Sequence, residues 1–216
     1  MRLITRQTFI KFQTLIAFTS LLFATTVTYA YTQPNTQPKT QQTVTPSDPA
    51  YIIHTTLKRI TTFSSNSDKV NPENLRGFIE REIIPHFDFD NMSHWITGRY
   101  ASNMGDKDKA EFQRSLRETF LSSLAKHLGS FDAKNTRIRF YPARYRGAAE
   151  AFVSTSIYRP DTSPVRLDFR MKQSGSDWKI IDVKANGSSA VLYYRRHFMS
   201  QLRSYQRRSP RPARHY

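Results

Sequence analysis

The stretch Val165-Arg166-Leu167-Asp168-Phe169-Arg170-Met171-Lys172 alternates between apolar and charged side chains along its whole length. Successive side chains of a β-strand point to opposite faces of the sheet, so this alternation predicts a strand with one apolar face and one face in water. Antiparallel sheets commonly pack one face on a core and leave the other solvated. We therefore expect this strand to belong to an antiparallel sheet that is covered on one side.

Three other segments of the chain have strand character: residues 136–141, 151–159 and 178–185. The connections between the later strands are short and contain Pro160, Pro164 and Gly175, which is typical of antiparallel hairpins. The sequence therefore predicts a curved antiparallel sheet of about four strands. In the last segment Ile180 and Ile181 are adjacent, so the pattern leaves open which of them faces inward.

Helices are expected before the strands. Asp48-Pro49 and Asn71-Pro72 each place a capping side chain before a proline at the first helical position, which predicts two helix starts. Pro85 is expected to stop the second helix, because proline lacks the N–H that the helix needs. A short helix is expected over residues 91–100 and a long one over residues 107–128.

The long helix has an apolar stripe at i, i+4 spacing, formed by Phe112, Leu116, Phe120, Leu124 and Leu128. Gly129 follows where a C-terminal cap is expected. From Ser188 onward helical spacing returns, through Val191, Tyr194, Phe198 and Leu202. Helices, then a meander, then one helix predict an α+β fold, in which N-terminal helices pack on the sheet and a C-terminal helix closes the domain.

The first thirty residues have the features of a secretory signal peptide. Arg2, Arg6 and Lys11 form a basic start, an apolar run follows over residues 15–24, and small residues flank a cleavage position after Ala30. A membrane-spanning helix needs about 20 apolar residues, and this run is about half as long. Because the chain has no cysteine, neither a lipid anchor nor a disulfide is available. We expect residues 1–30 to be removed and the protein to work in the bacterial periplasm.

The remaining chain is expected to divide into three parts. Residues 31–47 are rich in Gln, Thr and Pro and predict a flexible linker. Residues 48–206 form the folded domain, and residues 207–216 form a disordered basic tail that either attracts an anionic surface or only aids solubility. The net charge of +16 indicates nucleic acid, anionic lipid or an acidic partner, and export argues against nucleic acid.

The sequence contains few signs of catalysis. It has no cysteine, no glycine-rich phosphate loop, no G-x-S-x-G elbow and no H-E-x-x-H motif. One polar cluster, His86, Asp88, Asp90 and His94, has side chains that bind metals or move protons. A simpler interpretation is that Asp88 and Asp90 cap the following helix and His94 faces water. We therefore expect no enzyme activity, no cofactor and no metal site.

The chain is also rich in large apolar residues, with 15 Phe and 11 Tyr. Apolar stripes on helices usually fill a core. Helices and a curved sheet can instead enclose a cavity, and composition does not decide between the two.

Four motifs, in order, resemble those of the MlaC family, also called the toluene-tolerance family. They are PHFDFDNM at residues 85–92 followed by Gly98-Arg99-Tyr100, PVRLDF at residues 164–169, WKIIDV at residues 178–183, and a closing pattern of Gly187, Ser189, Val191, Tyr194, Arg195 and Phe198. The resemblance covers about residues 48–203. The chain departs from the family pattern at Ala101, Asn186 and Tyr193.

This resemblance implies a monomeric periplasmic carrier of phospholipid with an internal apolar pocket, no cofactor and no chemistry. Such carriers move lipid between an outer-membrane lipoprotein–porin complex and an inner-membrane ABC transporter complex, and so maintain outer-membrane lipid asymmetry. The acyl chains lie between sheet and helices, and the implied wall residues are Phe78, Ile79, Ile83, Phe87, Met92, Phe112, Phe120, Leu124, Leu167, Phe169, Ile181, Val183 and Val191. Arg99 and Arg195 are candidates to contact the phosphate, or else take part in structural ion pairs.

Two alternatives belong to other functional classes. One is a periplasmic enzyme that uses the His86, Asp88, Asp90 and His94 cluster, because a fold does not determine a function. The other is an interaction module with a filled core, whose basic surface binds an anionic partner.

Overall fold

A computed structural model describes residues 48–66, 71–160 and 162–208. The predicted signal peptide, the predicted linker and the last residues of the predicted tail lie outside these ranges. The elements follow in the order α1 (Pro49–Ser64), α2 (Pro72–Glu82), η3 (Ile84–His86), α3 (Phe89–Thr97), η4 (Gly98–Asn103), α4 (Asp106–Gly129), β1 (Arg137–Phe140), β2 (Arg144–Arg146), β3 (Glu150–Tyr158), β4 (Val165–Ser174), β5 (Asp177–Ala185), β6 (Ser188–Ser189) and α5 (Ala190–Arg208).

The two predicted helix starts are confirmed. The Asp48 carboxylate accepts a hydrogen bond from the backbone N–H of Ala50 at 2.8 Å, and the Asn71 side chain accepts one from Asn74 at 2.8 Å. Each cap satisfies an N–H that has no partner inside the first turn of its helix. Helix α2 ends at Glu82, before the predicted stop at Pro85.

Three details of the expected helices are corrected. Gly129 is the last residue of α4 and Ser130 is its C-cap, so the predicted cap lies one residue too early. The expected helix over residues 91–100 is instead α3 followed by the 3₁₀ helix η4, because Gly98 has a positive φ of 55° that ends the α-helix. Helix α5 continues to Arg208, two residues beyond the predicted end of the domain.

The sheet is antiparallel, with the strand order β1-β3-β4-β5-β6, and β2 also pairs with β3. The four predicted strands are β1, β3, β4 and β5. Strands β1 and β2 pair with successive parts of β3, at Phe140 opposite Thr155 and at Arg144 opposite Phe152. Pro142 lies between them and cannot donate to the ladder, so the edge is divided into two short pieces.

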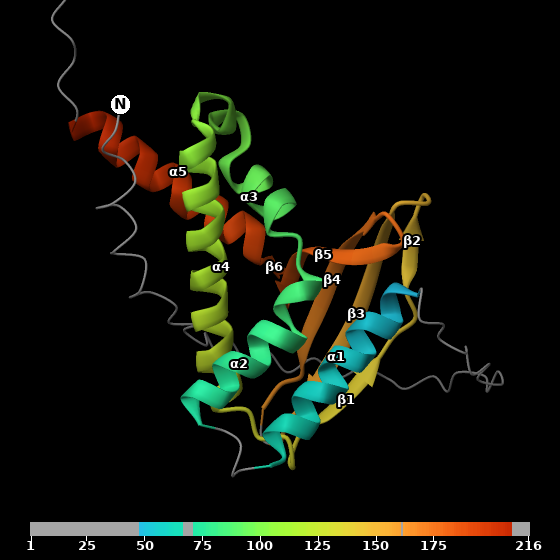
Figure 1. Ribbon diagram of the computed structural model, residues 1–216. Helices are drawn as coiled ribbons and strands as arrows, with labels where there is room; N and C mark the ends of the chain where they lie inside the picture. The colour runs from blue at the N-terminus through green and yellow to red at the C-terminus, as the bar shows by residue number, and fades with distance from the viewer. Residues whose placement is uncertain (1–47, 67–70, 161, 209–216) are drawn as a thin grey trace, which may run out of the picture.

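A bulge in β5 decides the inner face that the sequence leaves open. Arg170 pairs with Asp182 and Met171 pairs with Ile180, so Ile181 is the extra residue. Val183 and Ile180 therefore both lie on the inner face of the sheet, opposite Phe169 and Met171. A bulge also increases the local twist, and Figure 1 shows β5 running at a steep angle to β1 and β3.

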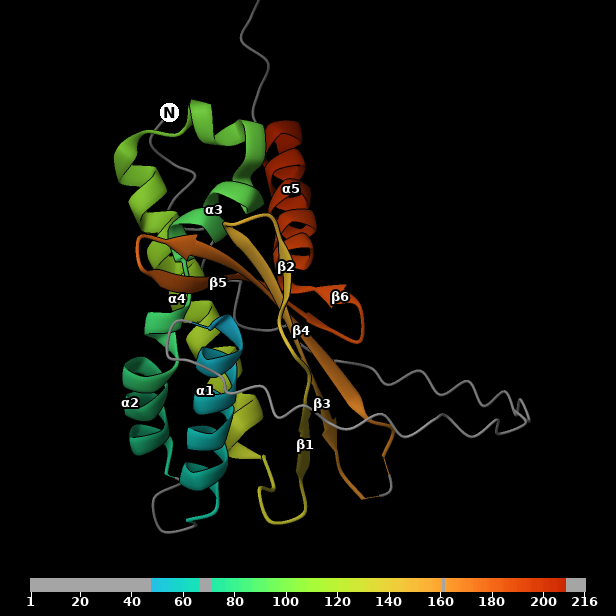
Figure 2. The ribbon, with the colours of Figure 1, turned by 90° about the vertical axis from the view of Figure 1, so that its right-hand side faces the viewer.

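The alternation in β4 is confirmed by burial. Phe169 and Met171 keep 8% and 0% of their surface exposed, whereas Arg166 and Lys172 are exposed. Figure 2 shows α1, α2 and α4 on one side of β1, β3 and β4. Helices α3 and α5 pack against each other, and α5 also contacts β5. Buried residues from all five α-helices and from β3, β4 and β5 form one hydrophobic cluster.

Within the described ranges, no helix has the length and hydrophobicity that crossing a bilayer requires.

Candidate functional site

The motif at residues 85–92 forms a junction between β5 and two helices. The backbone N–H of Asp88 donates to the carbonyl oxygen of Ile180 at 2.9 Å, and the Asp88 side chain caps α3 by accepting from Asn91 at 2.9 Å. This double attachment fixes the flanking rings of Phe87 and Phe89. Both rings contact Phe120 of α4, at centroid distances of 4.6 and 5.6 Å.

Most of the predicted wall residues are brought together. Seven are buried in the hydrophobic cluster: Phe78, Ile79, Ile83, Met92, Phe112, Phe169 and Val191. Five more are partly buried and pack against it: Phe87, Phe120, Leu124, Leu167 and Val183. Ile181 is buried but lies outside the cluster, because it is the bulged residue of β5. Ile180 takes its place on the inner face.

Partly buried apolar residues pack against the core from several elements, including Ile52 and Phe63 of α1 and Phe198 of α5, and two rows of them lie on α4 and on the sheet. On α4 they are Phe120, Leu124, Ala125 and Leu128, and on the sheet they are Ile138, Phe140, Leu167 and Val183. Helix α4 packs on α2 and α3, and Figure 2 shows α4 on the same side of strands β3 and β4 as α1 and α2. Solvent therefore reaches an apolar helix face and an apolar sheet face that both border the same core.

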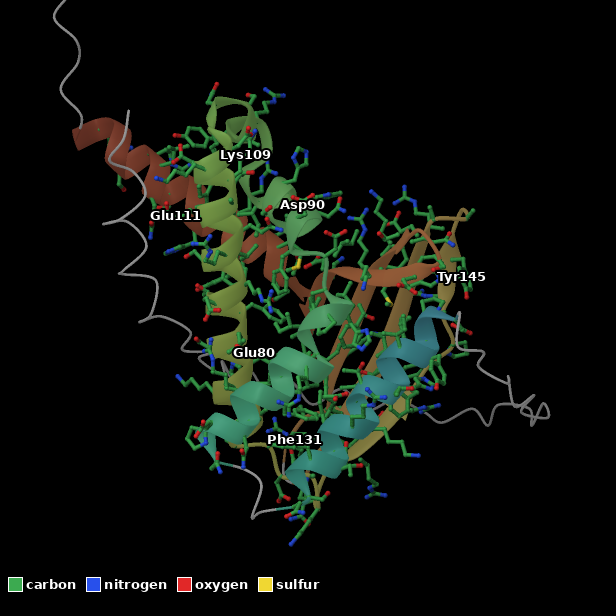
Figure 3. The ribbon with its side chains drawn as sticks, in the orientation of Figure 1. Glu80, Asp90, Lys109, Glu111, Phe131 and Tyr145 are labelled. Carbon is green, nitrogen blue, oxygen red and sulfur yellow. The ribbon has the colours of Figure 1, made fainter. Side chains whose placement is uncertain are left out.

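Two hollows open on the surface near α3. The first, of about 820 Å³, lies between α3, η4 and α4 and is bordered by Arg99, Phe112 and His94. Asp90 and Lys109, labelled in Figure 3, also border it and come from α3 and α4. The second, of about 850 Å³, is bordered by Phe87 and the end of β4. Neither is lined by the inward-facing sheet residues Leu167, Phe169 and Val183.

The two arginines predicted to contact a headgroup are placed differently. The Nη1 group of Arg195 on α5 donates to the backbone carbonyl of Trp95 on α3 at 2.7 Å. Arg195 therefore has a structural role at the end of α3, where helix carbonyl groups lack partners and attract cations. Arg99 is exposed and borders the first hollow.

The polar cluster of the motif separates in the structure. Asp88 caps α3 as predicted, Asp90 stands in the first turn of α3 without capping it, and His94 is exposed. Burial lowers the pKa of His86 below its ordinary value, and the positive charges of Lys179 and Arg59 lower it further. The described residues contain no group of three or more His, Cys, Asp or Glu side chains that could hold a metal ion.

Sequence reasoning missed Asp182, which is buried in β5. Its carboxylate accepts a hydrogen bond from the Ser189 hydroxyl at 2.7 Å and another from the backbone N–H of Val191 at 3.1 Å. These bonds fix the start of α5 against the sheet. The available signal was an acidic residue inside an apolar strand, where a carboxylate needs hydrogen-bond partners to be buried.

Comparison with known proteins identifies the group to which this architecture belongs. The fold is that of a helix-covered, curved antiparallel sheet with apolar walls. The family model described as MlaC protein matches residues 53–208, so the chain belongs to the MlaC family. The resemblance inferred from the four motifs is thus confirmed.

A solved structure with a similar fold is described as a phospholipid-binding protein from Ralstonia solanacearum in complex with a phospholipid. The two chains superpose with a TM-score of 0.66 at 19% identity, over 74% of this chain and 89% of that one. No curated protein matches the chain.

Proposed function

We propose that the protein binds a phospholipid and carries it through the periplasm between the outer and inner membranes, which maintains the lipid asymmetry of the outer membrane. The observation that carries the proposal is the pair of partly exposed apolar walls, with Phe120 and Leu124 on α4 and Leu167 and Val183 on the sheet. Family membership and the phospholipid-bound relative in Ralstonia solanacearum support it.

Physical chemistry explains why a carrier is needed. Each methylene group removed from water stabilises the bound state by about 0.8 kcal/mol, so a two-chain lipid alone in water is strongly disfavoured. If the pocket is about as apolar as the bilayer, moving the lipid from the bilayer into the pocket changes the free energy little. Direction then has to come from partner machines, for which we propose an inner-membrane ABC transporter complex and an outer-membrane lipoprotein–porin complex.

The bound lipid is proposed to lie between the two walls. The side chains of Ile79, Met92 and Met171 are fully buried and fill the interior in this structure. In the loaded state α4 and the sheet would separate along their partly buried rows, and the acyl chains would occupy the space between them. The headgroup would remain near solvent, where the exposed Arg99 and Arg195 are the candidates to contact it.

Lipid content measured by mass spectrometry after organic extraction tests the proposal. Protein purified from cells should contain phospholipid, and Leu167→Asp should lose it, because a carboxylate would lie where acyl chains are proposed. Gln173→Asp, at an exposed position of the same strand, makes the same change in net charge; it is the matched control and should keep the lipid. Wild-type protein without phospholipid, or Leu167→Asp with the wild-type ratio, would contradict the proposal.

A further inference from the structure

The face of the sheet that points away from the core is rich in cations. Several of them form no ion pair within the described part of the chain, among them Arg137, Arg139, Arg144, Arg146, Lys172 and Lys184. We call these six residues the basic face. Of the acidic residues on the same side, Glu150 pairs with Arg170, Asp168 pairs with Arg166, and Asp182 is buried and hydrogen-bonded at the start of α5. The net charge of this side of the sheet is therefore strongly positive.

Strand pairing places two guanidinium groups together on one ring. Arg139 of β1, Ser156 of β3 and Arg166 of β4 are direct cross-strand neighbours. The guanidinium carbons of both arginines lie over the Tyr141 ring, at 5.3 and 5.6 Å from its centroid. The Tyr141 hydroxyl is in turn hydrogen-bonded to Ser156 at 3.3 Å. The Tyr141 ring thus holds both guanidinium groups by cation–π contacts. Arg166 is also paired with Asp168, so Arg139 carries the charge that an oxyanion would stabilise.

Exposed aromatic rings accompany these cations. Tyr158, 37% exposed, is the cross-strand neighbour of Arg137. Trp95, 43% exposed, lies under the guanidinium of Arg170, whose carbon is 4.6 Å from the ring centroid. Tyrosine and tryptophan are the side chains that settle at the headgroup level of a bilayer, because one end is apolar and the other is polar. The combination favours a lipid surface over an acidic protein surface.

We propose that the basic face docks on a bilayer of anionic phospholipid. The basic residues are spread over four strands. Lipid headgroups move freely in the bilayer, so they can pair with cations that do not form one compact site. Each Lys or Arg near such a surface strengthens binding about fivefold. This proposal rests on the proposed carrier function, in which the docking surface holds the carrier at a membrane. Helices α1, α2 and α4 lie on the other side of the strands, so docking leaves the proposed pocket walls uncovered (Figure 2).

Co-sedimentation of the purified protein with vesicles tests this docking surface. The vesicles contain phosphatidylcholine with phosphatidylglycerol, and pure phosphatidylcholine vesicles are the reference. The test variant is Arg137→Glu with Arg144→Glu, on β1 and β2. The matched control is Arg81→Glu with Arg117→Glu, which makes the same change in net charge on α2 and α4. Circular dichroism melting verifies that both variants are folded.

Wild-type protein should bind the anionic vesicles and lose binding as salt is raised. The test variant should bind at least about 25-fold more weakly, and the control should lose less than about fivefold. Equal losses in the two variants, or no binding by the wild-type protein, would overturn the proposal. Wild-type protein that binds immobilised polyglutamate but not the vesicles would also overturn it, and would indicate an acidic protein partner.

Phospholipid content, measured separately by native mass spectrometry, keeps this test independent of the proposed function. Both variants should retain bound lipid, because neither pair of residues lies in the hydrophobic cluster. If the wild-type protein lacked lipid, the carrier function would fail whatever the vesicles showed.

Discussion

Arg195 and Trp95 connect the closing helix to the middle of the molecule. The guanidinium of Arg195 donates to the Trp95 carbonyl at 2.7 Å, and it lies directly against Gly98. A Cβ atom at Gly98 would lie 2.9 Å from Nη2 of Arg195. The contact therefore requires glycine at residue 98, both for space and for its positive φ of 55°.

Gly98→Ala should destabilise the protein by about 1–3 kcal/mol, because it combines backbone strain with the loss of the Arg195 contact. Gly175→Ala is the matched control: its φ is 61°, and a Cβ there would meet nothing within 4 Å. The control should show the backbone strain alone, about 1 kcal/mol. Urea denaturation measures both values, and equal losses would show that the contact with Arg195 contributes nothing.

Asp182→Ala should lower the free energy of unfolding by about 1–3 kcal/mol, because it removes the acceptor for Ser189 and for the N–H of Val191 in a buried site. Asp177→Ala, at the exposed start of the same strand, is the control and should change stability by less than about 0.5 kcal/mol. Denaturant titration measures the free energy of unfolding of both variants. If the two variants are equally stable, Asp182 does not fix the start of α5.

The helices and the four longer strands were predictable because their signals are local. A cap before proline at Asp48 and Asn71, and strict alternation in residues 165–172, each depend only on neighbours in the chain. Strand β6 had a usable signal in Asn186-Gly187, whose φ values of 48° and 83° suit a two-residue hairpin. Strand β2 is only three residues long, too short for a periodic pattern to appear.

The site was less predictable, because it depends on register and on contacts that are distant in sequence. The bulge at Ile181 changes which residues of β5 face inward, and no pattern within residues 178–185 reveals it. Arg195 donates to a backbone carbonyl group 100 residues away in the sequence, and no local pattern predicts that contact. From its charge alone, Arg195 is a candidate to bind a phosphate. The apolar wall residues were easier to select, since apolar side chains on regular elements usually face the core.

The stability of the protein should fall as the pH drops below about 6.5. Burial lowers the pKa of His54, an effect only partly opposed by the charge of Asp48, and burial also lowers the pKa of His86. The unfolded chain then binds protons that the folded protein excludes, so the free energy of unfolding decreases from about pH 6.5 down to the lowered pKa values. The surroundings of His54 explain why its ring resists protonation. Its Nε2 is buried without a hydrogen-bond partner, and its ring centroid lies 4.1 Å from that of Phe140.

Urea denaturation at about pH 7.5 and about pH 5.5 measures this effect, since the range spans the ordinary pKa of histidine. The double variant His54→Asn with His86→Asn should lose less stability between the two values than the wild-type protein. His127→Asn, at an exposed position on α4, should behave like wild type. An unchanged pH dependence in the double variant would mean that other groups cause the loss.

Charges introduced at buried and at partly buried wall positions should have different effects. Phe169→Asp places a carboxylate in the filled core, where 8% of Phe169 is exposed, and should destabilise the protein by several kcal/mol. Leu124→Asp, on the partly exposed row of α4, should cost less, because water reaches that position. Thermal melting compares the two. Equal destabilisation would show that water does not reach the apolar residues between α4 and the sheet.

We propose that the acyl chains lie between α4 and the inner face of the sheet. A phospholipid with a photoreactive diazirine in the middle of one acyl chain tests it, by irradiation of the loaded protein and peptide mass spectrometry of the adducts. We expect adducts on Phe120 and Leu124 from the helix and on Leu167 and Val183 from the sheet. Adducts confined to the hollow beside α3, at His94 or Arg99, or to the outer face of the sheet, would contradict it.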